Sequence, residues 1–274
     1  LVLVPPLHGG QPVEEEDASR PSSAARLEFM QQLLKDMTLE ATEEGDGREL
    51  TFQLKPLLRY SDVTRGIADS AIWRLGTSGR PIAIVTSELY GGGGRQFLLN
   101  HEFLAIDNPR LRLQRDSFEW QPSEGALKFQ SIEFEVRPSQ NPRLRLSQFK
   151  RLAARFSAQQ ELNRSKIVLR QTPTPIDRYL PSGKPNADGA IFAFVWGVNP
   201  EALLFLETDG TNWSYAWARL GAARVQAELE GTVVWEQPPA SQHEHPTAVY
   251  TSIHRSARIP LELGGDGGDE TPQP

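Results

Sequence analysis

The spacing of apolar residues predicts two amphipathic helices in this chain. In the first, residues 27, 30, 33, 34 and 37 are apolar, which is the i, i+3, i+4, i+7 spacing of one helix face. In the second, residues 146, 149, 152, 153 and 156 have a similar spacing. Ser22 or Ser23 can cap the first helix, and Asn141 followed by Pro142 suits the start of the second.

The segments after each helix have the short apolar runs and turn residues of antiparallel strands. Residues 71–75 and 82–87 predict one hairpin, and residues 190–196 and 202–207 predict another. The second hairpin is almost wholly apolar, which is typical of strands covered on both faces. Further strands are expected at residues 96–103, 110–114, 118–121, 127–136, 213–219, 224–229, 232–236 and 248–254. Each helix is therefore followed by a predicted β-meander.

The two halves of the chain are similar in sequence at a fixed offset of 119 residues. Between residues 26 and 89, fourteen of sixty-four positions are identical at that offset, several times the chance level. The charged residues that align are Arg59, Asp69 and Glu88 in the first half and Arg178, Asp188 and Glu207 in the second. We interpret these repeated residues as structural ion pairs, each set tying a strand to the hairpin that follows it.

From this pattern we expect an α+β fold of two tandem repeats, each one amphipathic helix packed on an antiparallel β-meander, related by a pseudo-two-fold axis. The expected units are residues 26–137 and residues 138–258. Residues 1–25 are expected to be a signal-peptide remnant and a disordered linker, which predicts an extracytoplasmic protein, periplasmic or secreted. Residues 259–274 are rich in Gly and acidic residues and predict a disordered tail.

Two motifs resemble a family of uncharacterised bacterial proteins. The first is Pro173-Thr174-Pro175-Ile176-Asp177-Arg178-Tyr179, and the second runs from Asp188-Gly189-Ala190 to Asn199-Pro200-Glu201. The resemblance covers most of residues 26–257 and implies an internally duplicated helix-plus-antiparallel-sheet module with no assigned activity. More loosely, a helix before a long meander is similar to the half-open barrels of periplasmic lipoprotein carriers, a likeness of topology alone.

The composition excludes several classes of function. The chain has no cysteine, which excludes disulfides, thiolate catalysis and Cys-ligated metal sites. Its net charge of -6 argues against binding nucleic acid by bulk charge. No catalytic motif is recognisable, so we predict neither enzyme activity nor a cofactor.

Trp213, Tyr215 and Trp217 occupy alternate positions of one predicted strand and therefore point to one face. They either line a ligand-binding groove or fill the core under the helix, and we keep them as candidate ligand-binding residues.

His243, His245 and His254 are the only concentration of histidines. Their spacing is not that of a zinc motif and their segment is a predicted loop, so we expect no metal site. His101 stands apart from them and is expected to be exposed or half-buried.

The second predicted helix is basic. Eight Lys or Arg residues lie between residues 141 and 170, against one Glu. The helix, taken as residues 142–162, either contacts anionic lipid at a membrane surface or presents a solvated face.

We therefore expect an exported, non-enzymatic binding or scaffold protein, with an unknown protein or an apolar ligand as its partner. One alternative is a periplasmic carrier of apolar ligands such as lipid or lipoprotein. The other is a metal-dependent hydrolase that uses the loop of His243 and His245.

Overall fold

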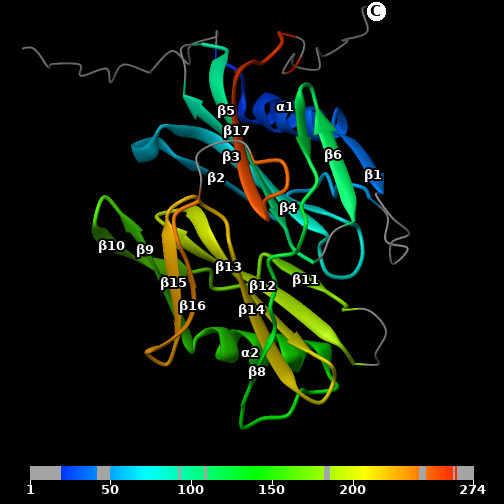
Figure 1. Cartoon of the computed structure of the whole chain (residues 1–274), viewed down its shortest axis with the longest axis vertical. Coiled ribbons are helices and arrows are strands. Elements are labelled where there is room, and N and C mark those ends of the chain that lie inside the picture. The colour runs from blue at the N-terminus through cyan, green and yellow to red at the C-terminus, as the bar shows by residue number, and fades with distance from the viewer. Residues whose placement is uncertain are drawn as a thin grey trace, which may run out of the picture.

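The computed structural model describes residues 20–41, 50–91, 94–107, 110–181, 186–240, 245–261 and 263. The expected signal-peptide remnant and most of the expected linker and tail lie outside these residues. Within them the chain forms two α-helices, one short 3₁₀ helix and seventeen strands in three antiparallel sheets (Figure 1). The helices are α1 (Ser23–Lys35) and α2 (Pro142–Ala153), and the 3₁₀ helix is η1 (Val63–Arg65).

Neighbouring strands pair in an antiparallel manner in each of the three sheets. The five-stranded sheet has the strand order β17 (Tyr250–Arg258), β5 (Gln96–Ala105), β4 (Ala83–Gly91), β3 (Ile67–Leu75) and β2 (Leu58–Asp62). The nine-stranded sheet has the order β16 (Thr232–Gln237), β15 (Arg224–Leu229), β9 (Phe156–Leu162), β10 (Ser165–Gln171), β12 (Asp188–Trp196), β13 (Asn199–Thr208), β14 (Trp213–Arg219) and β8 (Gln130–Ile132), with β11 (Asp177–Tyr179) on β12. The three-stranded sheet has the order β1 (Thr38–Ala41), β6 (Leu111–Arg115) and β7 (Phe118–Trp120).

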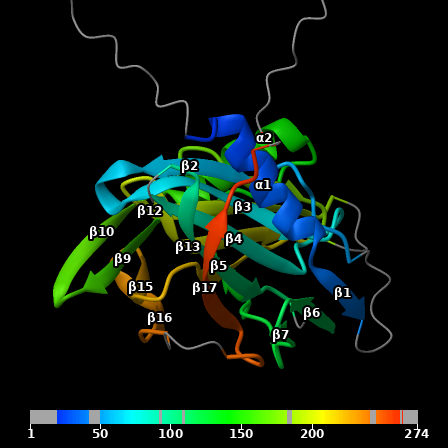
Figure 2. The same ribbon diagram turned by 90° about the horizontal axis from the view of Figure 1, so that it is seen from above.

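The two larger sheets pack face to face between the two helices, which lie at opposite ends of the long axis (Figure 1). Seen from above, the three-stranded sheet lies on one flank and the β9–β10 and β15–β16 hairpins on the other (Figure 2). One apolar core lies under α1, a second under α2, and a third between the sheets. Strands β12 and β13 are thus buried on both faces, as their apolar sequence predicts.

Both helices begin where their capping residues predict. The Ser22 side chain accepts a hydrogen bond from the backbone N–H of Ala25 at 3.1 Å. Asn141 Oδ1 accepts one from the backbone N–H of Arg143 at 2.9 Å, and Pro142 is the first residue of α2. The apolar face of each helix is buried, with Met30 in α1 and Phe149 in α2 fully covered.

The nine-stranded sheet curls into a half-barrel. Strands β14 and β16 are six places apart in the sheet, yet the rings of Trp217 and Trp235 stack across the gap with 5.9 Å between centroids. The gap between these two strands is a seam at which the barrel does not close by backbone pairing.

The expected α+β fold of two helix-plus-meander repeats is wrong. The structure is mostly β, with 51% strand and 13% helix. Two strands also cross between the halves, since β8 pairs with β14 and β17 pairs with β5. The outer strands differ as well, because β1, β6 and β7 form a sheet of their own whereas β9, β10, β15 and β16 extend the large sheet. Long-range pairing, which has no local signal in the sequence, decides these arrangements.

Some side-chain contacts nevertheless match at the 119-residue offset. Asp69 accepts hydrogen bonds from Arg59 and from Arg26 of α1, each at 2.9 Å. Asp188 accepts them from Arg178 at 3.0 Å and from Arg145 of α2 at 2.7 Å. The carboxylate therefore joins each helix to its sheet, and this local correspondence does not extend to the strand order.

Glu88 and Glu207, the third pair of repeated residues, do not pair with those arginines. Tyr60 donates to Glu88 at 3.0 Å, and Tyr179 donates to Glu207 at 2.6 Å. Arg80 of the five-stranded side also reaches Glu207 at 2.7 Å, so this carboxylate ties the two sheets together.

The backbone of Gly189 on β12 lies so close to the ring of Tyr179 that there is no room for a Cβ atom. A Cβ at this position would lie 2.5 Å from a ring carbon of Tyr179, whose hydroxyl is held by Glu207. We expect Gly189→Ala to lower the free energy of unfolding by about 1–3 kcal/mol, because the buried ring has no room to move. Gly91→Ala is the control, since a Cβ there is at an ordinary 3.5 Å from Gly66 O. Urea denaturation of both variants checks this, and equal losses would contradict it.

Candidate functional site

The three aromatic residues of β14 point to the inside of the half-barrel, as the alternation predicts. Two of them belong to the core alone, and the third also lines a pocket. Trp213 and Tyr215 are buried under α2, where the ring centroid of Trp213 is 5.2 Å from that of Phe149. The indole N–H of Trp213 donates to Val136 O at 3.0 Å, so its polar atom is satisfied within the core. Trp217 is also buried, but it lines a pocket at the seam.

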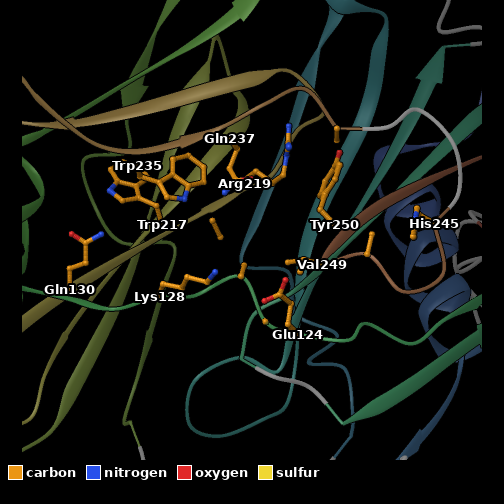
Figure 3. Close-up of a pocket in the computed structure, with 15 residues that line it drawn as sticks. Glu124, Lys128, Gln130, Trp217, Arg219, Trp235, Gln237, His245, Val249 and Tyr250 are labelled. Carbon is orange, nitrogen blue, oxygen red and sulfur yellow. The ribbon is translucent and has the colours of Figure 1, made fainter.

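This pocket, the seam pocket, has a volume of about 410 Å³ (Figure 3). Four segments form it: β14, β16, residues 124–130 up to the start of β8, and the segment of residues 245–250 that leads into β17. Its labelled side chains are Glu124, Lys128, Gln130, Trp217, Arg219, Trp235, Gln237, His245, Val249 and Tyr250. The two tryptophans lie together at one end, and Arg219 and Tyr250 lie at the other.

The indole N–H of Trp217 is a buried donor without an acceptor. Trp217 is 2% exposed, and its Nε1 has no hydrogen-bond partner. The indoles of Trp73 and Trp120, by contrast, donate to backbone carbonyls at 3.2 and 2.8 Å. Because an unpaired buried donor costs about 1–3 kcal/mol, a ligand acceptor that reaches this atom would recover free energy.

The opposite wall of the pocket is held in place by hydrogen bonds. Arg219 donates to the carbonyls of Gly221, Ala223 and Pro238 at 2.7–2.8 Å, and its guanidinium lies over the ring of Tyr250. Burial lowers the pKa of Arg219, although the group keeps its charge at neutral pH. The Tyr250 hydroxyl donates to Glu102 at 2.6 Å. The wall is therefore preorganised and presents an aromatic edge beside a fixed positive charge.

The rim of the pocket supplies exposed polar groups. Lys128 and Glu124 lie at its mouth on the 124–130 connection. Gln130 is fixed there, because its Oε1 accepts a hydrogen bond from Tyr215 at 2.8 Å. A floor of aromatic rings with a few polar groups around it is the usual composition of a small-molecule site.

The histidines do not form one group in the described part of the chain. His243 lies outside the described residues, His245 lines the seam pocket, and His254 lines a different cavity. Among the residues described, no three His, Asp or Glu side chains are placed to hold a metal ion. His101 was expected at or near the surface, and this is wrong, because it is fully buried.

The basic helix is shorter than expected, since α2 ends at Ala153 and residues 156–162 form β9. Part of its positive charge is already paired. Arg145 binds Asp188, and Arg155 binds Glu230 at 2.8 Å. Neither helix in the described ranges is long and apolar enough to cross a membrane.

Sequence analysis missed most of the seam pocket. Trp235 and Gln237 lie on a strand whose place beside β14 follows from the curl of the sheet. The strand expected at residues 127–136 forms only at residues 130–132, as β8, so the pocket-lining residues before it lie in a connection. The available signal was composition, because four of the six tryptophans fall between residues 196 and 235.

The chain was compared with models of protein families, with curated proteins and with solved structures, and none of them matches it significantly.

Proposed function

We propose that this protein is a non-enzymatic binding protein that holds a small ring-shaped molecule, of the kind a sugar provides, in the seam pocket. The observation that carries the proposal is the unpaired, buried N–H of Trp217, a residue that lines an aromatic-floored pocket of about 410 Å³. A sugar ring has an apolar face that can pack on Trp235 and oxygen atoms at its edge that can accept from Trp217, Arg219 and Lys128.

A carrier of apolar ligands remains the second candidate, since the half-barrel has an aromatic interior. That interior is filled by its own side chains, however, with Phe156 and Phe194 packed on Trp217 and Phe149 packed on Trp213. A ligand is therefore better accommodated at the seam, where polar groups surround it, than within the barrel. Export from the cytoplasm stays a proposal based on the N-terminal sequence.

The indole N–H signals of the six tryptophans provide the test by NMR. We expect at least one member of a panel of monosaccharides and β-1,4-linked disaccharides to shift the Trp217 signal saturably. The signals of Trp73 and Trp213 should stay in place, because their donors are bonded within the core. Substitution Trp217→Phe assigns the signal. If no sugar moves it, or if only the apolar probe N-phenyl-1-naphthylamine does, the sugar proposal fails.

A second prediction concerns removal of the partly exposed ring of Trp235. Trp235→Ala should weaken binding of the sugar found above at least tenfold, because the ligand loses its packing surface. Trp196→Ala is the control: it is another half-buried tryptophan of the same sheet but lies outside the seam pocket. Titration by NMR or calorimetry measures both, and an equal loss in the two variants would point to a general effect on folding.

A further inference from the structure

A second cavity, the acidic cleft, lies between the two large sheets and has a volume of about 480 Å³. Its charged residues are Arg65, Glu88, Glu102, Glu201 and His254, and Asn100 lies among them. Glu88 and Glu102 come from adjacent strands of the five-stranded sheet, and Glu201 comes from β13 of the facing sheet. Three carboxylates from two sheets thus border one space.

Glu88 is satisfied by neutral donors alone. Tyr60 donates to its Oε1 at 3.0 Å, while Tyr90 and Asn100 Nδ2 donate to its Oε2 at 2.9 and 3.0 Å. These bonds fix its position but bring no positive charge. The carboxylate therefore contributes a negative potential to the cleft.

The side chain of Asn100, which lines the cleft, has an amide oxygen that accepts no hydrogen bond. Its side chain is 6% exposed, and its Oδ1 has no hydrogen-bond partner. The orientation of the amide is not free to reverse, because Glu88 can only accept and so requires the Nδ2 on its side. The buried Oδ1 of this cleft-lining residue is therefore an acceptor that the described residues leave without a donor.

The carboxylates of Glu102 and Glu201 also accept few hydrogen bonds. Tyr250 donates to Glu102 Oε1 at 2.6 Å, and no described residue donates to its Oε2. Glu201 binds Arg65 at 3.2 Å, the one ion pair among the three carboxylates. Burial raises the pKa of Glu102 well above its usual value, and the charge of Glu88 raises it further. Burial raises the pKa of Glu201 to about 7, against the opposing effect of Arg65.

The cleft suits a hydrogen-bonding cation better than a metal ion. The described carboxylates do not converge closely enough for three of them to coordinate one ion. A primary ammonium has three N–H donors that reach separate acceptors, and the cleft offers Asn100 Oδ1 and Glu102 Oε2. We propose that the acidic cleft binds the primary ammonium group of a small organic amine.

The proposal makes binding dependent on pH. A cation favours ionised carboxylates, so Glu102 and Glu201 release protons on binding, and affinity rises as the pH increases from 6 to 8. The other charged or titratable groups that face them are Tyr60 of β2, Arg65 of η1, Tyr90 of β4, Arg219 of β14, and Tyr250 and His254 of β17.

Putrescine is the probe, and the indole signal of Trp196 is the reporter, because the Arg65 guanidinium lies 4.1 Å from the centre of that ring. We expect saturable binding of putrescine that shifts the Trp196 signal and leaves the Trp217 signal in place. Glu102→Gln keeps the size of the side chain and should weaken binding at least tenfold. Glu119→Gln, on an exposed carboxylate of β7, should not change it.

Tetramethylammonium separates hydrogen bonding from charge, because it has the same charge and no N–H donor. Equal binding of both cations, or equal affinity of wild type and Glu102→Gln, would overturn the proposal, as would an affinity that falls between pH 6 and pH 8. Because Trp196 and Trp217 report on different cavities, failure here is distinguishable from failure of sugar binding at the seam pocket.

Discussion

Replacement of Asp188 by Ala is expected to lower the free energy of unfolding by about 3–5 kcal/mol. The Asp188 side chain is 1% exposed and pairs with Arg145, which is 5% exposed, and with Arg178. Without Asp188, the guanidinium of Arg145 stays buried with no negative charge, and its remaining bonds go to the carbonyls of Ser139 and Gln140. Thermal and urea unfolding of the purified variant measure the loss.

Asp69 is the matched comparison, because it has the same two kinds of partner at the 119-residue offset. Its arginines, Arg26 and Arg59, are 22% and 29% exposed, so water can solvate them when the carboxylate is removed. We expect Asp69→Ala to cost about 1–3 kcal/mol, less than Asp188→Ala. Equal losses at the two sites would show that burial of the arginine is not what sets the cost. If Asp188→Ala does not fold, the free energy of unfolding is measured on Asp188→Asn instead.

Local features of the fold were predictable from the sequence, whereas the assembly of the sheets was not. Helix caps such as Asn141 and the β3–β4 and β12–β13 hairpins depend on residues that are close in sequence. The pairing of Trp213 with Ile132 joins residues that are far apart in the sequence, as does the pairing of Tyr250 with Leu104. Such pairings depend on tertiary packing, and they decided both the strand order and the fold class.

The same distinction applies to the sites. Alternation correctly placed Trp213, Tyr215 and Trp217 on one face, but the pocket at Trp217 exists because β16 curls back toward β14. The acidic cleft depends on a second sheet covering Glu88 and Glu102. The burial of His101, in contrast, was predictable from the sequence. This residue alternates with Leu99 and Phe103, both of which are buried in the first apolar core.

That burial gives His101 a large expected effect of pH on stability. Burial, together with the nearby charge of Arg115, lowers the pKa of His101 from 6.5 to about 3. Arg115 donates to Nε2, so the neutral ring carries its proton on Nδ1, which lies 2.9 Å from Ser87 Oγ. A second proton would have to replace the bond from Arg115 with a repulsion between two cations.

Because the folded-state pKa lies below the unfolded value, this stability is fully present above pH 6.5 and is lost as the pH falls toward 3. The slope approaches about 1.4 kcal/mol per pH unit below pH 6.5, and the loss between pH 6.5 and pH 4.5 is about 2 kcal/mol. The raised pKa values of Glu102 and Glu201 act in the opposite direction, because protonation stabilises those buried groups. The effect of His101 must therefore be measured as a difference between wild type and His101→Gln.

We expect that difference in the free energy of unfolding to shrink by about 2 kcal/mol between pH 6.5 and pH 4.5, since only the wild type has the buried ring to protonate. His254→Gln, which removes an exposed histidine of β17, is measured in parallel as the control variant. NMR of the ring protons gives a second measurement that does not need the variant to fold: His101 should show no titration above about pH 4. A ring that titrates near pH 6 would mean that water reaches it, and the assignment of His101 to the closed core under α1 would then be wrong.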